Sequence, residues 1–406
     1  MRILFLTSRL PYPPFRGDKL KIYNLIRQLS RNHDITLLSF IQHRSEQQWI
    51  PELKKYCRDV EVIHLSRIAS IWNCVKAIPK AIPFQVAYFE SPAMVRKLRD
   101  VEASLQPDIL HTHLIRMACY TEKNLRPGRV LDLTDAVSLY LERFMKTQRN
   151  PFKRAALRIE LGRMLRFEPV IARFDRALVC SAVDKEALER NVPRARISIM
   201  ENGVDLEQFG NQDGSGSADP FRIIYTGNMS YYPNADGAQF LVNDILPSIK
   251  KVVPGAKVYV VGQNPPRAVR ALAREDVVIT GFVQDIRAEY LKSAVAVSPV
   301  RFGAGTLNKI LEPIALGIPV VTTSTGVEGL GLVPGKDILV ADDSEGFARH
   351  VVALLTDSAL RASLTSGAPE KVRSRFGWDQ IARTLERVYA EVRHRDRPAV
   401  GEVLEQ

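Results

Sequence analysis

The stretch Ser298–Thr323, which reads SPVRFGAGTLNKILEPIALGIPVVTT, limits the possible folds of this chain most tightly. It predicts the end of a buried strand, a glycine turn, a helix and a second strand. Gly303 and Gly305 allow a tight turn in which bare backbone N–H groups can approach a ligand. Thr306 is placed to cap the helix and Gly317 to end it. This order of elements is typical of an α/β fold with a parallel sheet.

The start of this predicted helix is suited to a phosphate group. The first N–H groups of a helix have no partner within it and carry partial positive charge. Arg301 precedes the turn and Lys309 lies one turn into the helix, so both can reach an anion held there. Glu312 follows on the same helix face. A diphosphate matches this cradle and ribose hydroxyls match the acid, although a Gly-x-Gly turn also occurs where a helix and a strand merely pack closely.

Length and charge bound the interpretation. A chain of 406 residues can form two domains with separate cores. The net charge of +12 is uneven: residues 1–200 hold 35 Lys and Arg against 20 Asp and Glu, whereas the remaining half is slightly acidic. The basic half predicts an anionic partner such as a membrane surface, although scattered solvated charges would give the same count. We find no nucleic-acid recognition motif and expect no nucleic-acid partner.

Cysteines and apolar runs give expectations about compartment and metal. The four cysteines are widely spaced and form no Cys-x-x-Cys pair, which argues against a zinc cluster or a disulfide framework. The apolar run Ile3–Leu6 is too short for a secretory signal, and no stretch approaches 18 apolar residues. We therefore expect a cytoplasmic protein with reduced thiols. No clear Asp-x-Asp site is present, so we expect neither a cofactor nor a required metal.

The same doubly wound pattern opens both halves of the chain. A strand at Arg2–Thr7 is followed by a proline-rich loop and a helix at Lys19–Arg31, and the pattern restarts at Arg222–Thr226. Gly210–Ser217 has the composition of a linker. We predict a first domain at residues 1–205, a linker at 206–220 and a second domain at 221–380. A terminal helix with a frayed tail is predicted at 381–406.

Polar side chains gather at the strand ends of the first half. A strand runs into His111 and His113, which lie on the same side of it. A metal would need a third ligand that is not apparent nearby, and a buried core histidine is an alternative for either position. The next strand leads to Asp132 and Asp135, whose carboxylates could hold sugar hydroxyls or an acceptor. The loop after the first strand adds Arg9, Arg16, Gly17, Asp18 and Lys19.

Two further segments combine apolar and basic residues. In Ile68–Pro83, apolar residues including Trp72 alternate with Lys76 and other basic residues, and two prolines forbid one long helix. This segment is expected either to lie on a membrane surface or to pack irregularly in the core. Arg149–Arg176 is strongly basic and is predicted to be helical.

These motifs together resemble the retaining glycosyltransferases of family 4, which have the GT-B fold of two Rossmann-like domains facing across a cleft. The family's Leu-Glu-Ala-Met-Ala and Gly-x-Pro-Val-Val runs correspond here to Leu311–Ala315 and Gly317–Val321, and Asn202–Asp205 is a recurrent family feature. The opening Pro-Tyr-Pro-Pro-x-x-Gly-Asp resembles bacterial sugar transferases of exopolysaccharide and PEP-CTERM export systems. The chain departs from the family where the first of two glutamates falls on Ala304. Pro313, which should kink the helix, is a second departure.

The resemblance implies a role for each candidate residue. Glu312 and His113 are the expected catalytic residues, with His113 near the reacting sugar and His111 as second choice. The expected donor-binding residues are Gly227, Asn228, Gly281, Phe282, Val283, Arg301, Gly303, Ala304, Gly305, Thr306, Leu307, Lys309 and Glu312. The expected acceptor-side residues are Arg16, Gly17, Asp18, His111 and Asp135. The terminal helix is expected to cross back to the first domain, as in other GT-B enzymes.

The implied function is transfer of a sugar from a nucleoside-diphosphate sugar to a glycan or lipid-linked acceptor, with retention, in exopolysaccharide or surface-glycan synthesis. A sugar-nucleotide epimerase of the same fold and a non-catalytic glycan- or nucleotide-binding relative are the alternatives. The missing first glutamate favours the second of these. The protein would work in the cytoplasm, at the inner face of the plasma membrane and against its anionic surface.

Overall fold

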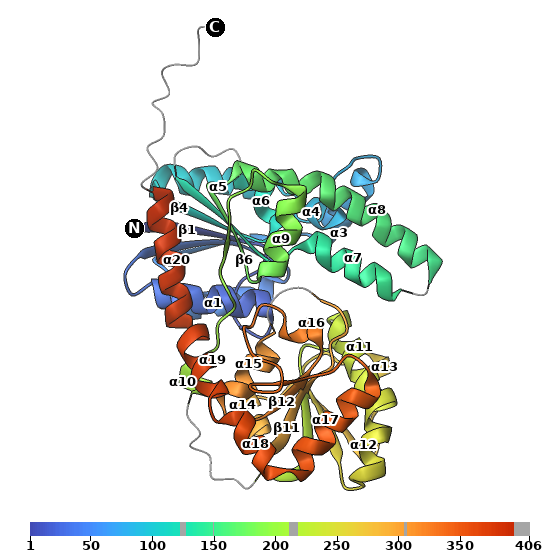
Figure 1. The fold of residues 1–406 in the computed structure, drawn as a ribbon. Coiled ribbons are helices and arrows are strands. Elements are labelled where there is room, and N and C mark those ends of the chain that lie inside the picture. Colours follow the sequence, from blue (N-terminus) through green and yellow to red (C-terminus); the bar gives the residue numbers. More distant parts are fainter. Residues whose placement is uncertain (122–126, 149, 211–217, 304–306, 394–406) are drawn as a thin grey trace.

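The computed structural model describes residues 1–121, 127–148, 150–210, 218–303 and 307–393. It contains two α/β domains, one above the other in Figure 1, each built on a parallel sheet. The first sheet has the order β3-β2-β1-β4-β5-β6-β7, with strands β1 (Arg2–Thr7), β2 (Asp34–Ile41), β3 (Asp59–His64), β4 (Ile109–His113), β5 (Gly128–Thr134), β6 (Arg176–Val179) and β7 (Ile197–Ile199). The second has the order β10-β9-β8-β11-β12-β13, with strands β8 (Asp219–Thr226), β9 (Lys257–Val261), β10 (Val277–Gly281), β11 (Ser293–Ser298), β12 (Val320–Thr322) and β13 (Leu339–Val340).

The strand order fixes where a ligand can bind. In the first sheet β1 pairs with both β2 and β4, and in the second β8 pairs with both β9 and β11. The direction of strand addition reverses at these two points, so the connecting loops diverge and leave room beyond the carboxyl ends of the strands. The expected α/β class with two doubly wound domains is confirmed.

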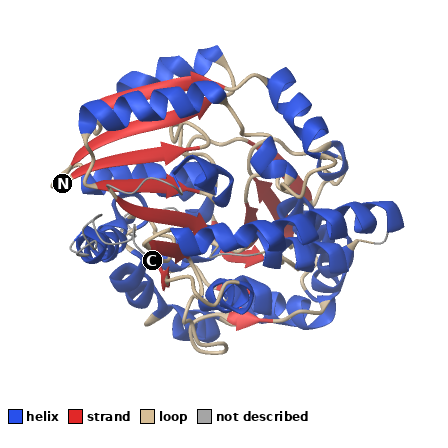
Figure 2. Ribbon diagram, turned by 90° about the horizontal axis from the view of Figure 1, so that it is seen from above, coloured by secondary structure: helices blue, strands red, loops and turns tan. Residues whose placement is uncertain are grey.

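Helices cover both faces of the sheets, as Figure 2 shows from above. In the first domain they are α1 (Gly17–Leu29), η1 (Arg44–Trp49), α2 (Ile50–Leu53), α3 (Arg67–Ala77), α4 (Phe84–Ala87), α5 (Pro92–Leu105), η2 (Ile115–Met117), α6 (Ala118–Thr121), α7 (Val137–Thr147), α8 (Pro151–Phe167), η3 (Glu168–Arg173) and α9 (Ala182–Asn191). The remaining helices are α10 (Leu206–Phe209), α11 (Tyr232–Phe240), η4 (Leu241–Ile245), α12 (Leu246–Val252), α13 (Arg267–Arg270), α14 (Ile286–Leu291), α15 (Asn308–Ala315), α16 (Ser324–Val327), α17 (Ser344–Thr356), α18 (Ser358–Thr365), α19 (Ala368–Phe376) and α20 (Trp378–Arg393).

The alternation of side chains along β1 shows how the first core is divided. Ile3 and Phe5 pack in a cluster with residues of α1 and α20, whereas Leu4 and Leu6 pack in another cluster with residues of α5. Successive side chains of a strand point to opposite faces, so an uninterrupted apolar run is what a strand covered on both faces requires. The short apolar strands of this sequence were therefore recognisable, and β1 has the bounds that were expected.

Helix α20 belongs to the core of the first domain although it follows the second domain in sequence. It lies beside α1 in Figure 1, and its residues Ile381, Leu385 and Val388 are buried with those of the first sheet. Tyr389 is fully buried, and its hydroxyl lies 2.8 Å from Nδ1 of His111. The chain thus crosses between the domains twice.

For Ile68–Pro83 the sequence left two alternatives, a segment on a membrane surface or irregular packing in the core, and the structure excludes the second. Residues from Arg67 to Ala77 form α3, but the apolar side chains of this helix face solvent, so irregular core packing is wrong. In the described ranges of the chain, no helix is both long and apolar enough to cross a membrane.

Candidate active site

Lys309, Asn234 and Gly227 meet at the carboxyl end of the second sheet. The ammonium group of Lys309, from α15, contacts the side-chain oxygen of Asn234 at the start of α11. The amide nitrogen of Asn234 donates to the carbonyl of Asn228, 2.9 Å away. Gly227 has a φ of +154°, and a Cβ there would lie 2.7 Å from the amide of Asn234 and 3.1 Å from the lysine nitrogen. Only glycine leaves the lysine room, so these three residues form the base of the cradle.

Glu312 lies on the same helix as Lys309 and accepts a 3.2 Å hydrogen bond from Tyr290. The tyrosine hydroxyl also lies 2.7 Å from that of Thr226, at the end of β8. Burial lowers the pKa of Lys309 to about 7, against the effect of Glu312, and burial raises the pKa of Glu312 to about 7, against the effects of Tyr290 and Lys309. Burial therefore leaves both charges poorly solvated, and an anion together with a hydroxyl donor would stabilise both of them.

Arg301 is engaged in a way that the sequence did not reveal. Its guanidinium makes two hydrogen bonds to the carboxylate of Asp236, at 2.9 and 2.7 Å, and lies over the ring of Phe240. A bidentate pair of this kind largely neutralises the arginine. The lysine rather than Arg301 is thus the cation at the base of the cradle.

Of the predicted glycine turn, the structure describes only Gly303 and Leu307 at the two ends. The predicted site residues Ala304, Gly305 and Thr306 lie outside the described residues. Helix α15 begins at Asn308 after Leu307, continues through Pro313 to Ala315, and is followed by Gly317 at φ +76°.

The loop after β10 lies against the first domain. Gly281 has a φ of +71° with open space around it, and the ring of Phe282 packs edge-on against that of Phe15, with centroids 5.0 Å apart. Gln263, after β9, donates a 2.8 Å hydrogen bond to the carbonyl of Phe15. The segment of the expected donor-binding residues Gly281, Phe282 and Val283 therefore borders the proline-rich first loop.

His111 and His113 share a strand but have different surroundings. His111 is fully buried between Tyr389 and Asp132, whose carboxylate lies 3.7 Å from its Nε2, so it is a core residue rather than an acceptor-side one. His113 lies at the end of β4, with Nε2 3.5 Å from the hydroxyl of Thr134. Burial lowers the pKa of His113 to about 3, so its imidazole is neutral at pH 7.

Asp132 also belongs to the core. It is fully buried and accepts a 2.8 Å hydrogen bond from the ammonium group of Lys21, on α1. Burial alone would raise the pKa of Asp132, but Lys21 holds it well below its usual range. The expectation that this carboxylate could hold sugar hydroxyls is therefore wrong, because its charge is already matched inside the protein.

Asp18 lies at the centre of a cluster of charged residues at the edge of the first domain. It pairs with Arg9 at 2.7 Å and with Arg16 at 3.6 Å. Burial alone would raise the pKa of Asp18, but these arginines and Arg116 lower it to about 2. Gly17, the residue before Asp18, begins α1. Burial, together with the charge of Asp184, raises the pKa of Asp135 to about 7.

Two arginines were missed by the sequence interpretation. Arg116 acts electrostatically on both Asp18 and Asp135, and burial lowers its pKa to about 10. Arg143, on α7, donates a 2.9 Å hydrogen bond to the carbonyl of Gly303 and pairs with Glu328 at 2.9 Å. Neither arginine has a sequence motif, because each acts through contacts with residues distant in the chain.

Backbone strain marks the same edge of the first sheet. Leu114 and Thr134, at the ends of β4 and β5, have φ values of +72° and +65°. Bulky or branched residues rarely adopt such angles, and each costs of the order of 1–3 kcal/mol. Strain at adjacent strand ends beside His113 and Asp135 is typical of a functional edge.

Across the described parts of the chain, no group of three or more His, Cys, Asp or Glu residues could hold a metal ion. The positive charges of the candidate site are those of Lys309 and of the arginines described above. The absence of a metal requirement remains a prediction.

Two family models match consecutive parts of the chain. Residues 21–208 match the model described as Glycosyltransferase Family 4, and residues 220–357 match the model described as Glycosyl transferases group 1. The chain is a glycosyltransferase. The two matches correspond to the two domains, and the loops that build the cradle lie within the second.

Solved structures with the same fold cover nearly the whole glycosyltransferase. Sucrose-phosphate synthase from Thermosynechococcus elongatus is 15% identical, with a TM-score of 0.70 over 97% of this chain and 99% of that one. HepE from Anabaena, solved in complex with UDP-glucose, is 16% identical, with a TM-score of 0.70 over 96% of this chain and 100% of that one. At these identities the comparison establishes the fold, which is GT-B.

Relatives by sequence are distant. An uncharacterized 44.6 kDa protein in the cps region of Klebsiella pneumoniae is 21% identical over 86% of this glycosyltransferase and 90% of its own length. D-inositol 3-phosphate glycosyltransferase from Xylanimonas cellulosilytica is 28% identical over 59% of this chain and 62% of its own. Glycogen synthase from Mycobacterium tuberculosis is 25% identical over 55% of this chain and 56% of its own.

Proposed function

We propose that this glycosyltransferase moves a sugar from a nucleoside-diphosphate sugar to a glycan or lipid-linked acceptor, with retention of the anomeric configuration. The observation that carries the proposal is the cradle of Lys309, Asn234 and Gly227 with Glu312 on the same helix. A diphosphate supplies the anion that this lysine needs, and ribose hydroxyls supply the donors that the carboxylate needs. HepE, solved with UDP-glucose, supports a donor of this chemical class.

The chemistry of the proposed reaction is electrostatic. Cleavage of the sugar–phosphate bond leaves a diphosphate whose negative charge grows as the bond breaks. Lys309 and the backbone N–H groups at the start of α15 stabilise that charge, and fixed positive groups of this kind supply a large part of many enzymatic rate enhancements. The acceptor oxygen attacks the anomeric carbon from the same face of the sugar that the diphosphate leaves. His113, at the edge of the first domain, lies close to this oxygen.

The setting of the reaction is also a proposal. The relative from a cps region spans 90% of its own length in the match, which supports a role in exopolysaccharide or surface-glycan synthesis. An acceptor on a lipid carrier is held in a membrane, so the enzyme would work in the cytoplasm at the inner face of that membrane.

Donor specificity and stereochemistry test the proposal together. The protein is incubated with UDP-, GDP- and ADP-sugars and an acceptor mixture, and the anomeric configuration of the product is read by proton NMR. We expect an α-linked donor to give an α-linked product. A β-linked product would contradict retention, an altered sugar nucleotide would indicate an epimerase, and binding without turnover would indicate the non-catalytic alternative.

Activity should survive chelation, because Lys309 and backbone N–H groups occupy the role that a divalent cation would otherwise take. Transfer is measured with and without EDTA at equal ionic strength. Abolition by EDTA, with recovery on addition of manganese, would contradict this prediction.

A further inference from the structure

Helix α3 turns its apolar face toward solvent. Its exposed apolar residues follow the spacing i, i+3, i+4, i+7 of a single helix face and continue to the residue just after the helix: Ile68, Ile71, Trp72, Val75 and Ile78. Ile68 is 82% exposed. A surface helix of a globular protein normally buries such a stripe. Here the inward face carries small or polar residues instead, of which Ser70 and Ala77 are buried.

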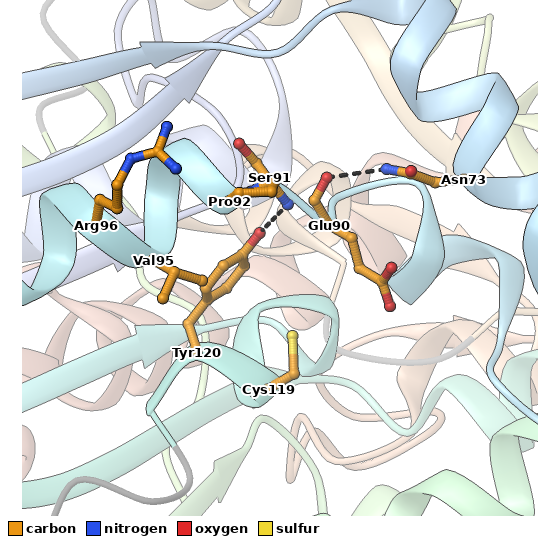
Figure 3. Close-up of a pocket in the computed structure, with 8 residues that line it drawn as sticks. All are labelled: Asn73, Glu90, Ser91, Pro92, Val95, Arg96, Cys119 and Tyr120. Carbon is orange, nitrogen blue, oxygen red and sulfur yellow. Dashed lines mark hydrogen bonds between the residues drawn. The ribbon is translucent and has the colours of Figure 1, made fainter.

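The inward face of α3 is held to the protein by polar contacts. Asn73 donates a 2.9 Å hydrogen bond to the carbonyl of Glu90, as Figure 3 shows at the rim of a cavity between α3, α5 and α6. The thiol of Cys74 lies 3.6 Å from the carbonyl of Phe84, and Ser66 caps the helix. These contacts fix the orientation of the helix, and in this orientation its apolar face is exposed to solvent.

A basic groove adjoins this face. The loop after α3 and helix α8 enclose a groove of about 470 Å³, and both elements lie on the same side of the first domain in Figure 1. The groove is lined by Ile78, Pro79, Lys80, Ala81, Arg158, Ile159, Gly162, Arg163 and Arg166, which include four cations and no acidic residue. Residues 66–89 and 151–167 together contain eight Lys and Arg and a single acidic residue, Glu160.

Arg163 is a buried cation of this groove with one unmatched donor. Its side chain is only 8% exposed, one nitrogen donates a 2.7 Å hydrogen bond to the carbonyl of Ile78, and the guanidinium lies over the ring of Phe84. The other terminal nitrogen, NH1, is buried without a hydrogen-bond partner. Leaving a charged donor unmatched is costly, and an anionic oxygen in the groove would satisfy it.

We propose that α3 and this groove form a docking surface for an anionic phospholipid bilayer, with a lipid phosphate in the groove and the apolar face of α3 in the acyl region. An amphipathic helix beside a basic patch has the two properties that interfacial binding needs. Trp72 suits the boundary, where an aromatic ring sits between headgroups and chains, and Lys76 lies over that ring at 5.7 Å. The first half of the chain is basic and the second is slightly acidic. Attraction to an anionic surface would therefore orient the first domain toward the membrane.

Vesicle sedimentation with the full chain tests the docking surface. We expect binding to vesicles of phosphatidylcholine with 30% phosphatidylglycerol, weakened by high salt, and little binding to pure phosphatidylcholine. The triple variant Lys80→Glu, Arg158→Glu and Arg166→Glu should lose about a hundredfold in partitioning, since each basic residue at an anionic surface contributes a several-fold factor. The control triple variant, on exposed basic residues of the second domain, is Lys251→Glu, Arg267→Glu and Arg270→Glu, and it should bind as wild type does.

The apolar contribution is tested separately. Ile68→Ser with Ile71→Ser should weaken vesicle binding by about tenfold, because two exposed side chains lose their burial in lipid, while Val252→Ser, an exposed apolar residue of the second domain, should have no effect. Emission of Trp72 should shift to the blue on anionic vesicles, and Trp72→Phe should remove the shift.

Three outcomes would overturn the proposal: equal partitioning onto both vesicle types, no binding to either, or a wild-type dimer that Ile68→Ser with Ile71→Ser dissociates in sedimentation velocity. The last would assign the apolar face to a second copy of the chain. Vesicle binding requires no donor and no turnover, so its failure would leave the proposed transferase reaction untouched.

Discussion

At the level of single residues, Lys309 and Glu312 form the part of the proposed donor site that would favour a ligand with both an anionic group and hydroxyl donors. Each is held where its charged form is poorly solvated, and each has a polar partner too weak to restore its usual pKa. The arginine that the sequence suggested for the same anion, Arg301, is matched by Asp236 instead. Of the two cations that the sequence suggested for a phosphate, Lys309 is thus the one without a carboxylate in hydrogen-bond contact among the described residues, and the role of each stays a prediction.

Lys309→Ala should weaken binding of a nucleoside diphosphate much more than binding of the nucleoside, because the ammonium group meets phosphate. The pH dependence follows from its pKa of about 7 in the free site. Since the diphosphate requires the protonated lysine, wild-type affinity should fall as pH rises above 7, by up to about tenfold per pH unit. Lys309→Arg keeps its charge and should show a flatter profile in calorimetry. Equal losses for both ligands in the alanine variant would show that the lysine does not meet phosphate.

His113→Asn should lower turnover while donor affinity and melting temperature change little, since this histidine lies at the strand end and not between the sheet and α20. The matched control is His111→Asn, which removes the contact with Tyr389 and should lower the melting temperature. If both variants lose stability to the same degree and turnover falls only in proportion, His113 is a second core histidine.

At the level of secondary-structure elements, α7 is one part of the first domain that contacts loops of the second domain. Phe144 stacks on Phe302 with ring centroids 5.5 Å apart, and Tyr140 stacks on Tyr231 at 6.0 Å. Arg143 lies between these rings in sequence and binds the carbonyl of Gly303. Helix α7 thus connects the first domain to Phe302 and Gly303 of the second.

Arg143→Ala should raise the KM for the donor several-fold with little change in melting temperature, because it frees one end of the glycine turn without disturbing a core. Glu142→Ala is the control, since it removes only an exposed pair with Lys146 on the same helix, and such pairs contribute about 0.3–0.5 kcal/mol. Steady-state kinetics at varied donor concentration measures the effect. An unchanged KM in Arg143→Ala would mean that the contact with Gly303 does not shape the donor site.

At the level of the whole molecule, α20 makes the first domain depend on the end of the chain. The helix completes a core formed by β1, β4 and β5, and its Tyr389 reaches the buried imidazole of His111. The second domain is therefore inserted between two parts of one folding unit.

Tyr389→Phe should destabilise the first domain by about 1–3 kcal/mol, the cost of leaving a buried imidazole nitrogen without its hydroxyl partner. Nucleotide affinity should be unchanged, because the donor site belongs to the other domain. Denaturant unfolding followed by tryptophan fluorescence measures the loss, and Arg387→Ala, on the exposed side of α20, is the control. A loss of nucleotide affinity that matched the loss of stability would indicate a single cooperative unit in place of two.

Most elements and their order could be predicted from local pattern. A short apolar run bounded by turn residues favours a buried strand, which located β1, and apolar residues at helical spacing located α20. The same local pattern placed Asp18 and Lys309 near helix starts and Glu312 one turn after Lys309, and the structure has them there, on α1 and α15.

The sequence could not show which of these residues are matched by partners inside the protein, because those partners come from distant segments. Alternation put His111 and His113 on one side of a strand, and both are buried, but only the arrival of α20 shows that His111 packs against Tyr389 while His113 lies beside Thr134 at the strand end. Arg116, Arg143 and the orientation of α3 depend on contacts between segments far apart in the chain. No local pattern encodes such contacts, because the free energy that selects them comes from packing and charge pairing across the whole fold.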